Sequence, residues 1–234
     1  MRFGLLGSLE VRDDEGRVIT VGGSQPRTVL AALLAAEGRT VSAEALVEAV
    51  WGEDPPASAT ATLQTYVSRL RRALEPHRGS RDPATLLVSE PTGYRLAAPA
   101  EAVDFRRFEQ LADRGRAALD AGRPDDAVAA LSEAEALWRG APLAGLAEAG
   151  FAHGVVVRLE ERRLAVLEHR LEADLALGRT GAVAARAAEL IPSFPLRERL
   201  RGLDELGVTH IGVAPPPDAT SVESWRRLLA DLGH

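Results

Sequence analysis

The sequence of 234 residues contains no cysteine, no lysine and no asparagine, and aromatic residues make up only 4% of it. Without cysteine, the chain can form neither disulfides nor thiolate metal sites, and it has no cysteine nucleophile. Because lysine is missing, all 28 basic residues are arginine, and 34 acidic residues leave a net charge of −6. This charge argues against a generally polycationic nucleic-acid binder, but it leaves room for local basic patches.

Long apolar runs are also missing. No stretch approaches the roughly 20 apolar residues that a membrane-spanning helix needs, and the opening segment MRFGLLGSLEVRDDEG lacks the layout of a signal peptide. We therefore expect a cytoplasmic protein without a membrane partner. The proportions of apolar residues (46%) and charged residues (26%) are typical of a globular chain, and the length leaves room for about two small domains.

Short strand patterns and helix patterns alternate in the first part of the chain, residues 1–97. Three alternating or apolar runs predict a small antiparallel sheet at 2–7, 8–12 and 17–21. Helices are expected from Pro26, after the N-cap Ser42, and over Ser58–Glu75. Two further runs, 85–90 and 93–97, predict a β-hairpin. Helices followed by a hairpin in this order are typical of a winged helix-turn-helix domain.

The second part, residues 98–202, carries helix patterns rich in Ala, Leu and Arg. Two turns, at Gly122–Pro124 and at Gly178–Arg179, each separate a pair of helices, and such pairs predict tetratricopeptide-like packing. The two glycines are 56 residues apart, which exceeds the standard repeat of about 34 residues and indicates an inserted segment, Gly140–Val157. The expected fold is therefore mainly α with small antiparallel β elements. Residues 203–234 form an atypical tail with a strand–loop–helix pattern.

The helix over Ser58–Glu75 carries the most informative pattern. At helical spacing one stripe is apolar, and it consists of Leu63, Val67, Leu70 and Leu74. The opposite face carries polar and cationic side chains that suit base edges and phosphates, namely Thr65, Ser68, Arg69 and Arg72, flanked by Gln64 and Arg71. Five arginines stand against one glutamate between Ser58 and Arg81. The alternative interpretation is that this polar face is an ordinary solvated helix surface. The helix lies between a second helix and a predicted hairpin, and this position favours DNA recognition.

The hairpin turn supplies a second signal. Thr92, Gly93 and Arg95 combine a small tip, a flexible residue and a cation, as a wing needs if it is to reach a minor groove and its phosphates. We expect Tyr94 to be largely structural, and Thr92 and Arg95 to face DNA.

Two runs, TLQTYVSRLRRALEP and LLVSEPTGYRL, resemble the C-terminal DNA-binding domain of OmpR-type response regulators. Together with MRFGLLGSLEVR, VDFRRFEQL, ALWRGAPLAGL and RLEERRLAVLEHRLEADLALGR, they resemble the Streptomyces antibiotic regulatory protein family over about residues 1–202. The resemblance implies an OmpR-like winged helix (residues 1–97) followed by a bacterial transcriptional activation domain (98–202). It also implies activation of secondary-metabolite genes through tandem direct repeats in promoter DNA, contact with RNA polymerase, and self-association on DNA in the bacterial nucleoid.

Carried over position by position, the resemblance assigns DNA contacts to ten residues. They are Arg27, Gln64, Thr65, Tyr66, Ser68, Arg69, Arg72, Thr92, Gly93 and Arg95. One departure is the pair Gln25–Pro26, where family members often have Lys-Gln. A larger departure is the tail, where the family continues with another helix pair, so we expect the activation domain to be truncated.

Signals for catalysis, cofactors or metals are weak. The five histidines lie far apart without carboxylates at metal-ligand spacing, and there is no Gly-rich phosphate loop. We therefore expect no enzyme, no cofactor and no metal, and we expect Trp51 and Trp138 in the core. The alternatives are a helical-repeat protein-interaction module with a degenerate DNA-binding domain and, from a weak likeness of the tail to a flavin monooxygenase barrel end, an enzyme fragment.

Overall fold

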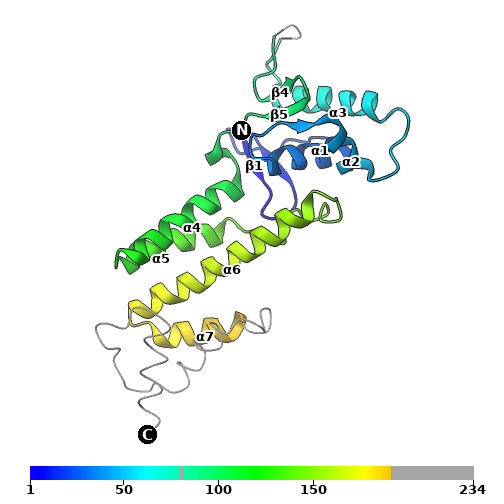
Figure 1. The fold of residues 1–234 in the computed structure, drawn as a ribbon. Helices are drawn as coiled ribbons and strands as arrows, with labels where there is room; N and C mark the ends of the chain where they lie inside the picture. Colours follow the sequence, from blue (N-terminus) through cyan, green and yellow to red (C-terminus); the bar gives the residue numbers. More distant parts are fainter. Residues whose placement is uncertain (80–81, 191–234) are drawn as a thin grey trace. The chain divides into compact units, whose positions relative to one another are not determined.

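The computed structural model describes residues 1–79 and 82–190 (Figure 1). The described residues form two compact units, the first from residues 1–108 and 137–161, and the second from 109–136 and 162–190. The elements up to the hairpin are β1 (Arg2–Gly4), β2 (Glu10–Arg12), α1 (Ser24–Ala35), β3 (Val41–Ser42), α2 (Ala43–Trp51), α3 (Ala59–Leu74), β4 (Leu87–Glu90) and β5 (Gly93–Leu96). They are followed by the 3-10 helix η1 (Ala100–Ala102), α4 (Asp104–Asp120), α5 (Pro124–Ala136), α6 (Ala152–Ala176) and α7 (Thr180–Leu190).

The N-terminal sheet is smaller than the sequence predicts. β1 and β2 pair antiparallel, with Phe3 opposite Val11 and both side chains buried. The strand expected at residues 17–21 was wrong, because this segment contributes only an isolated bridge between Val18 and Arg12. Val18 is 63% exposed, whereas Val21 is buried, so the segment does bury an apolar side chain but pairs with β2 at this bridge only.

The strand expected over residues 2–7 also ends early, at Gly4. The next two amide groups, of Leu5 and Leu6, donate to the two carboxylate oxygens of Asp104 over 2.7 and 3.0 Å. Their carbonyl oxygens accept hydrogen bonds from the amide groups of Leu143 and Arg139 over 2.9 and 2.8 Å. These backbone groups therefore bind distant segments of the first unit and cannot continue a strand ladder.

Three helices, α1, α2 and α3, pack on one another in the first unit (Figure 1). The Ser42 hydroxyl caps α2 as expected, since it accepts a hydrogen bond from the Ala45 amide over 3.1 Å. The predicted apolar stripe of α3 is confirmed, because Leu63, Val67, Leu70 and Leu74 are all at most 3% exposed. Each such side chain contributes about 1.5–3 kcal/mol relative to an exposed position. On α2 only Leu46 is fully buried, while Val47, Val50 and Trp51 are half-buried.

The predicted hairpin is confirmed as β4 and β5, which join β3 in an antiparallel sheet of order β3-β5-β4. Gly93 pairs with Glu90 on one side and with Ser42 on the other. A Cβ at Gly93 would lie 2.7 Å from the Ser42 Cα and closer still to the Val41 carbonyl oxygen. Only glycine therefore allows β3 and β5 to approach this closely.

Residues 137–161 complete the first unit. Arg139 donates a hydrogen bond to Asp104 over 3.0 Å, and Trp138 packs edge-to-face on the buried Phe108 with ring centroids 5.3 Å apart. Burial raises the pKa of the Asp104 carboxyl above its ordinary value, and the hydrogen bonds from Leu5, Leu6 and Arg139 offset only part of that effect. Trp138 is half-buried, so the expected core position is reached only in part.

The described part of the second unit consists of helix pairs, as the sequence predicts. At both turns a glycine with positive φ ends the helix, Gly122 at +68° and Gly178 at +74°. In each case the following arginine amide reaches back five residues, from Arg123 to Ala118 and from Arg179 to Asp174, and both helices thus end in a Schellman motif. At the contact of the first pair, a Cβ at Gly115 would lie 2.5 Å from the Leu131 side chain. Small residues allow the two helices to pack closely.

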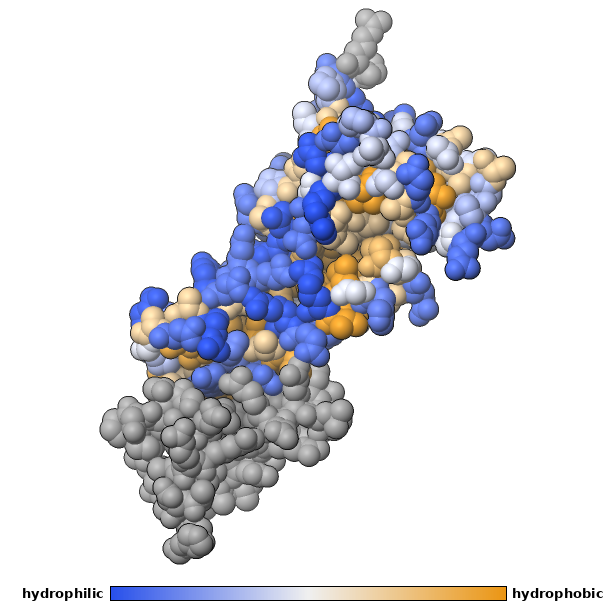
Figure 2. Space-filling view, viewed as in Figure 1, coloured by the Kyte–Doolittle hydropathy of each residue, from blue (hydrophilic) through white to orange (hydrophobic). Residues whose placement is uncertain are grey.

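The atypical tail expected over residues 203–234 lies outside the described residues. The same holds for the expected truncation, the loss of a helix pair from the activation domain. Among the described residues, no helix is long and apolar enough to cross a membrane. Hydrophilic residues, blue in Figure 2, cover large parts of the surface in this view.

Candidate nucleic-acid interface

The solvent face of α3 presents the side chains that the sequence predicts there. Gln64, Thr65, Ser68, Arg69 and Arg72 are all exposed. The helix contains three arginines and no acidic residue. Within residues 1–79 and 82–190, Arg69 and Arg72 have no hydrogen-bonded or ion-paired protein partner. Their guanidinium groups are therefore available to an outside ligand.

Tyr66 lies at the edge of this face and is half-buried. Its hydroxyl donates a hydrogen bond to the Gln25 side-chain oxygen at the start of α1. Its ring stacks on Trp51 at the end of α2, with ring centroids 6.1 Å apart and an interplanar angle of 15°. Tyr66 thus joins all three helices, and a DNA contact by this residue stays a prediction.

Arg27, at the start of α1, is half-buried and donates a hydrogen bond to the Leu9 carbonyl oxygen over 2.6 Å. This bond connects α1 to the segment that leads into β2. A guanidinium has five N–H donors, so this contact leaves others for a phosphate.

The three predicted wing residues differ in their surroundings. Thr92 is exposed at the turn, whereas Gly93 is buried against β3. Arg95 is half-buried and pairs with the Glu90 carboxylate over 3.0 Å across the hairpin. Of the three, Thr92 alone is fully available at the surface, and the cation of the wing already has an anionic partner.

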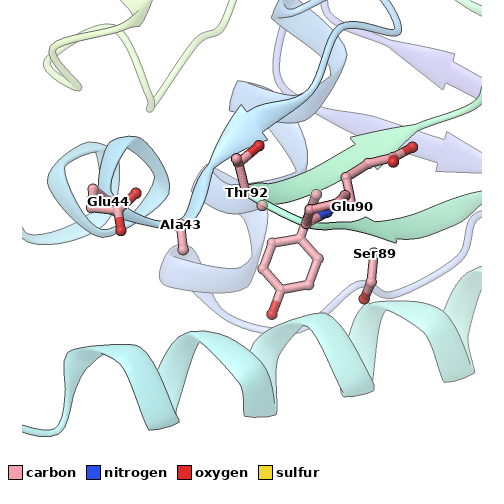
Figure 3. Close-up of a pocket in the computed structure, with 8 residues that line it drawn as sticks. Ala43, Glu44, Ser89, Glu90 and Thr92 are labelled. Atoms are coloured by element: carbon pink, nitrogen blue, oxygen red, sulfur yellow. The ribbon is translucent and has the colours of Figure 1, made fainter.

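An open hollow of about 480 Å³ lies beside the wing (Figure 3). Ala43 and Glu44 of α2 line it together with residues 89–94 of the hairpin. In Figure 3, Ser89 points toward α3 and Glu90 points away from it, as successive strand residues do. Two carboxylates line this hollow, and that of Glu90 is paired with Arg95.

Sequence reasoning missed two residues that organise the interface, Arg71 and Glu75. Arg71 donates hydrogen bonds to the Leu87 carbonyl oxygen and to the Ser89 hydroxyl, each over 2.8 Å. Glu75 accepts hydrogen bonds from Thr85 and from the following amide group. Burial raises the pKa of the Glu75 carboxyl, but these hydrogen bonds and the nearby arginine at position 78 outweigh it, and the pKa lies below its ordinary value. The helix pattern placed Arg71 only on the flank of the exposed face.

Within the part of the chain that the structure describes, no candidate metal centre competes with this interface. Among the described residues, no group of three or more His, Asp or Glu could hold a metal ion. The interface therefore consists of hydroxyl, amide and guanidinium groups, which suit the donors and acceptors of nucleic acid.

A winged helix-turn-helix followed by paired helices defines a transcriptional regulator. Residues 20–96 match the family profile "Transcriptional regulatory protein, C terminal", and residues 103–208 match "Bacterial transcriptional activator domain". The chain belongs to the Streptomyces antibiotic regulatory protein family, whose members are regulators of transcription and not enzymes. The predicted fold class, an OmpR-like winged helix followed by helical repeats, is confirmed.

The relatives cover nearly the whole chain. It is 40% identical over 232 residues to the regulatory protein AfsR of Streptomyces coelicolor, an alignment that covers 99% of this chain and 22% of AfsR. It is 38% identical over 237 residues to the regulatory protein DnrI of Streptomyces peucetius, which covers 100% of this chain and 86% of DnrI. Among solved structures, Mycobacterium tuberculosis EmbR in complex with a low affinity phosphopeptide has a TM-score of 0.84 at 32% identity, covering 98% of this chain and 65% of EmbR. The chain thus spans about a fifth of the length of AfsR.

Proposed function

We propose that this chain is a sequence-specific DNA-binding activator of secondary-metabolite genes. In this proposal residues 1–97 bind double-stranded promoter DNA, residues 98–202 contact RNA polymerase, and residues 203–234 are a separate tail. The observation that carries the proposal is the exposed face of α3, where Arg69 and Arg72 lack a protein partner among the described residues and no acidic side chain opposes them. Family membership supports the same function.

The dimensions of α3 suit the major groove. An α-helix with its side chains is about 10–12 Å across, and the major groove of B-DNA is about 12 Å wide. In the proposed complex, Gln64, Thr65, Ser68, Arg69 and Arg72 meet base edges and phosphates. Arginine can bind guanine with two hydrogen bonds, which gives the α3 face a means of reading sequence.

The wing then contacts an adjacent minor groove, with Thr92 at its tip and Arg95 at the phosphates. Tyr66, Arg27 and Gly93 have partners within the free protein, so we assign them mainly to shaping the surface. One protomer offers few cations, and binding to tandem repeats about one helical turn apart supplies the remaining affinity through self-association. Such a complex resides in the bacterial nucleoid.

The test is a fluorescence-anisotropy titration of the full chain on duplex DNA from its own upstream region and on a scrambled duplex, at two salt concentrations. Arg69→Ala and Arg72→Ala should each cost about 1–3 kcal/mol on the specific duplex if the side chain reads a base. A residue that contacts phosphate only should weaken both duplexes alike and reduce the salt dependence.

The matched control is Arg114→Ala, which removes the same charge from an exposed position of α4. It should bind both duplexes as the wild type does. Weak binding to both duplexes, unchanged in Arg69→Ala and Arg72→Ala, would contradict the proposal. The helical repeats would then act as a protein-interaction module attached to a degenerate DNA-binding domain.

A further inference from the structure

Two charged side chains one helical turn apart attach the wing to α3. Arg71 and Glu75 are separated by four residues, the spacing at which opposite charges on a helix often pair with each other. Here both reach across to the strand segment 85–89 instead. The helix pattern places Arg71 on the flank of the recognition face, and in the structure its guanidinium bonds within the protein.

The contacts of Arg71 fix an orientation as well as a position. Its Nε donates to the Leu87 carbonyl oxygen and its terminal nitrogen to the Ser89 hydroxyl, both over 2.8 Å. One acceptor belongs to the strand backbone and the other to a side chain, and in Figure 3 Ser89 points toward α3. A planar guanidinium that donates to two acceptors on one strand holds the strand more rigidly than a single ammonium donor can.

Glu75 secures the beginning of the same segment. One carboxylate oxygen accepts hydrogen bonds from the Thr85 amide at 2.9 Å, the Thr85 hydroxyl at 2.7 Å and the Leu86 amide at 3.2 Å. Glu75 therefore holds the start of this segment, and Arg71 holds β4 at Leu87 and Ser89.

The sheet attaches the hairpin to the rest of the first unit over only a few residues. β3 consists of only two residues, Val41 and Ser42, and it pairs with β5, while β4 is an outer strand of the described sheet. A two-residue ladder restricts the twist and tilt of a hairpin only weakly. The angle of the wing relative to α3 therefore depends on further contacts, which are those of α3 with β4 and those of α1 with β5.

We propose that Arg71 is a positioning residue, which holds the wing at a fixed angle to α3 through Leu87 and Ser89 so that helix and wing meet adjacent grooves together. The role rests on the proposed function, because an angle between two DNA-contacting elements matters only if both contact DNA. Arg71 itself contacts no DNA. Its neighbour Arg72, exposed on the next position of the helix, is a contact residue.

This pair of neighbours permits a sharp comparison. Arg71→Gln and Arg72→Gln remove the same charge from adjacent positions, and Ser89→Ala removes only one acceptor of Arg71 without changing charge. Hydroxyl-radical footprinting of the full chain on its upstream duplex reports the helix-contacted and wing-contacted grooves separately. In Arg71→Gln the wing protection should disappear while the helix protection persists, and the affinity should fall about tenfold, which corresponds to about 1.4 kcal/mol. Arg71→Lys should restore part of the protection, and Ser89→Ala should weaken it.

A second measurement needs no DNA. Because the chain has no cysteine, spin labels can be placed on Ala61→Cys in α3 and Thr92→Cys at the wing turn without removing native thiols. The distribution of label distances should broaden in Arg71→Gln and stay narrow in Arg72→Gln. Circular dichroism at the same temperature confirms that both variants are folded.

The outcomes separate the two proposals. Unchanged label distances in Arg71→Gln, or equal loss of helix and wing protection in Arg71→Gln and Arg72→Gln, would overturn the positioning role alone. A wild-type chain that binds its upstream and scrambled duplexes equally would overturn the proposed function, and the positioning role of Arg71 with it.

Discussion

Gly93→Ala should destabilise the first unit although it adds only one methyl group. The sequence assigns Gly93 to the DNA interface, whereas the structure places it in a close approach of β3 and β5. The new Cβ would lie 2.7 Å from the Ser42 Cα and closer to the Val41 carbonyl oxygen. Both atoms belong to the backbone, so no side-chain rotation relieves the overlap and a strand has to move.

The cost follows from two effects. Forcing a methyl group into a packed site costs about 1–3 kcal/mol. Moving β3 away from β5 also weakens backbone hydrogen bonds, each with a net contribution of about 0.5–1.5 kcal/mol. The sum is about 2–4 kcal/mol, and since a chain of this size loses about 2–4 °C in Tm for each kcal/mol, we expect a decrease of roughly 4–16 °C.

The assay is thermal unfolding of the full chain without DNA, followed by circular dichroism, with urea unfolding as a second measure. Gly140→Ala is the matched control, because a Cβ there would meet no atom within 4 Å. It should change stability by less than about 0.5 kcal/mol. If Gly93→Ala unfolds at the wild-type temperature but binds DNA less well, the packing argument is wrong and Gly93 acts through the DNA contact instead.

Two further sites give distinct expectations. Asp104→Ala removes the acceptor of two amide groups and of Arg139, and it should cost about 2–4 kcal/mol in urea unfolding, with an unchanged midpoint as the contrary result. Because burial raises the pKa of the Asp104 carboxyl, the stability that its protonation contributes is complete below the ordinary pKa and is lost as the pH rises through the folded-state value. Stability of Asp104→Asn, measured against pH, should lack this decline. Glu90→Gln removes the partner of Arg95, so affinity for scrambled DNA should rise roughly twofold to fivefold with a steeper salt dependence, and an equal salt slope would argue against a phosphate contact by Arg95.

Local patterns were sufficient for most of the first unit's helices and for the hairpin. The stripe from Leu63 to Leu74 repeats at helical spacing, and the Ser42 cap and the glycine turns obey rules that involve only neighbouring residues. The same rules located the exposed face of α3. Periodicity alone determines which side of a helix is apolar, and the polar side follows from it.

Long-range partners decided the features that sequence reasoning missed. The sequence distance between Tyr66 and Gln25 is 41 residues, and Arg71 binds a strand 16 to 18 residues further along the chain. No local pattern distinguishes an arginine whose guanidinium bonds within the protein, such as Arg71, from one whose guanidinium lies in solvent, such as Arg72. The early end of β1 has the same origin, since its acceptor, Asp104, is 99 residues away from Leu5.

The path of the backbone through the first unit has a consequence for folding during synthesis on the ribosome. Residues 137–161 return to the N-terminal segment after the chain has built α4 and α5 of the described fold. Leu5 and Leu6 therefore emerge long before Arg139 and Leu143, which bond to their carbonyl oxygens, have been synthesised. During that interval the nascent winged helix lacks its closing segment, and the first unit reaches its complete hydrogen bonding only when translation has passed this segment.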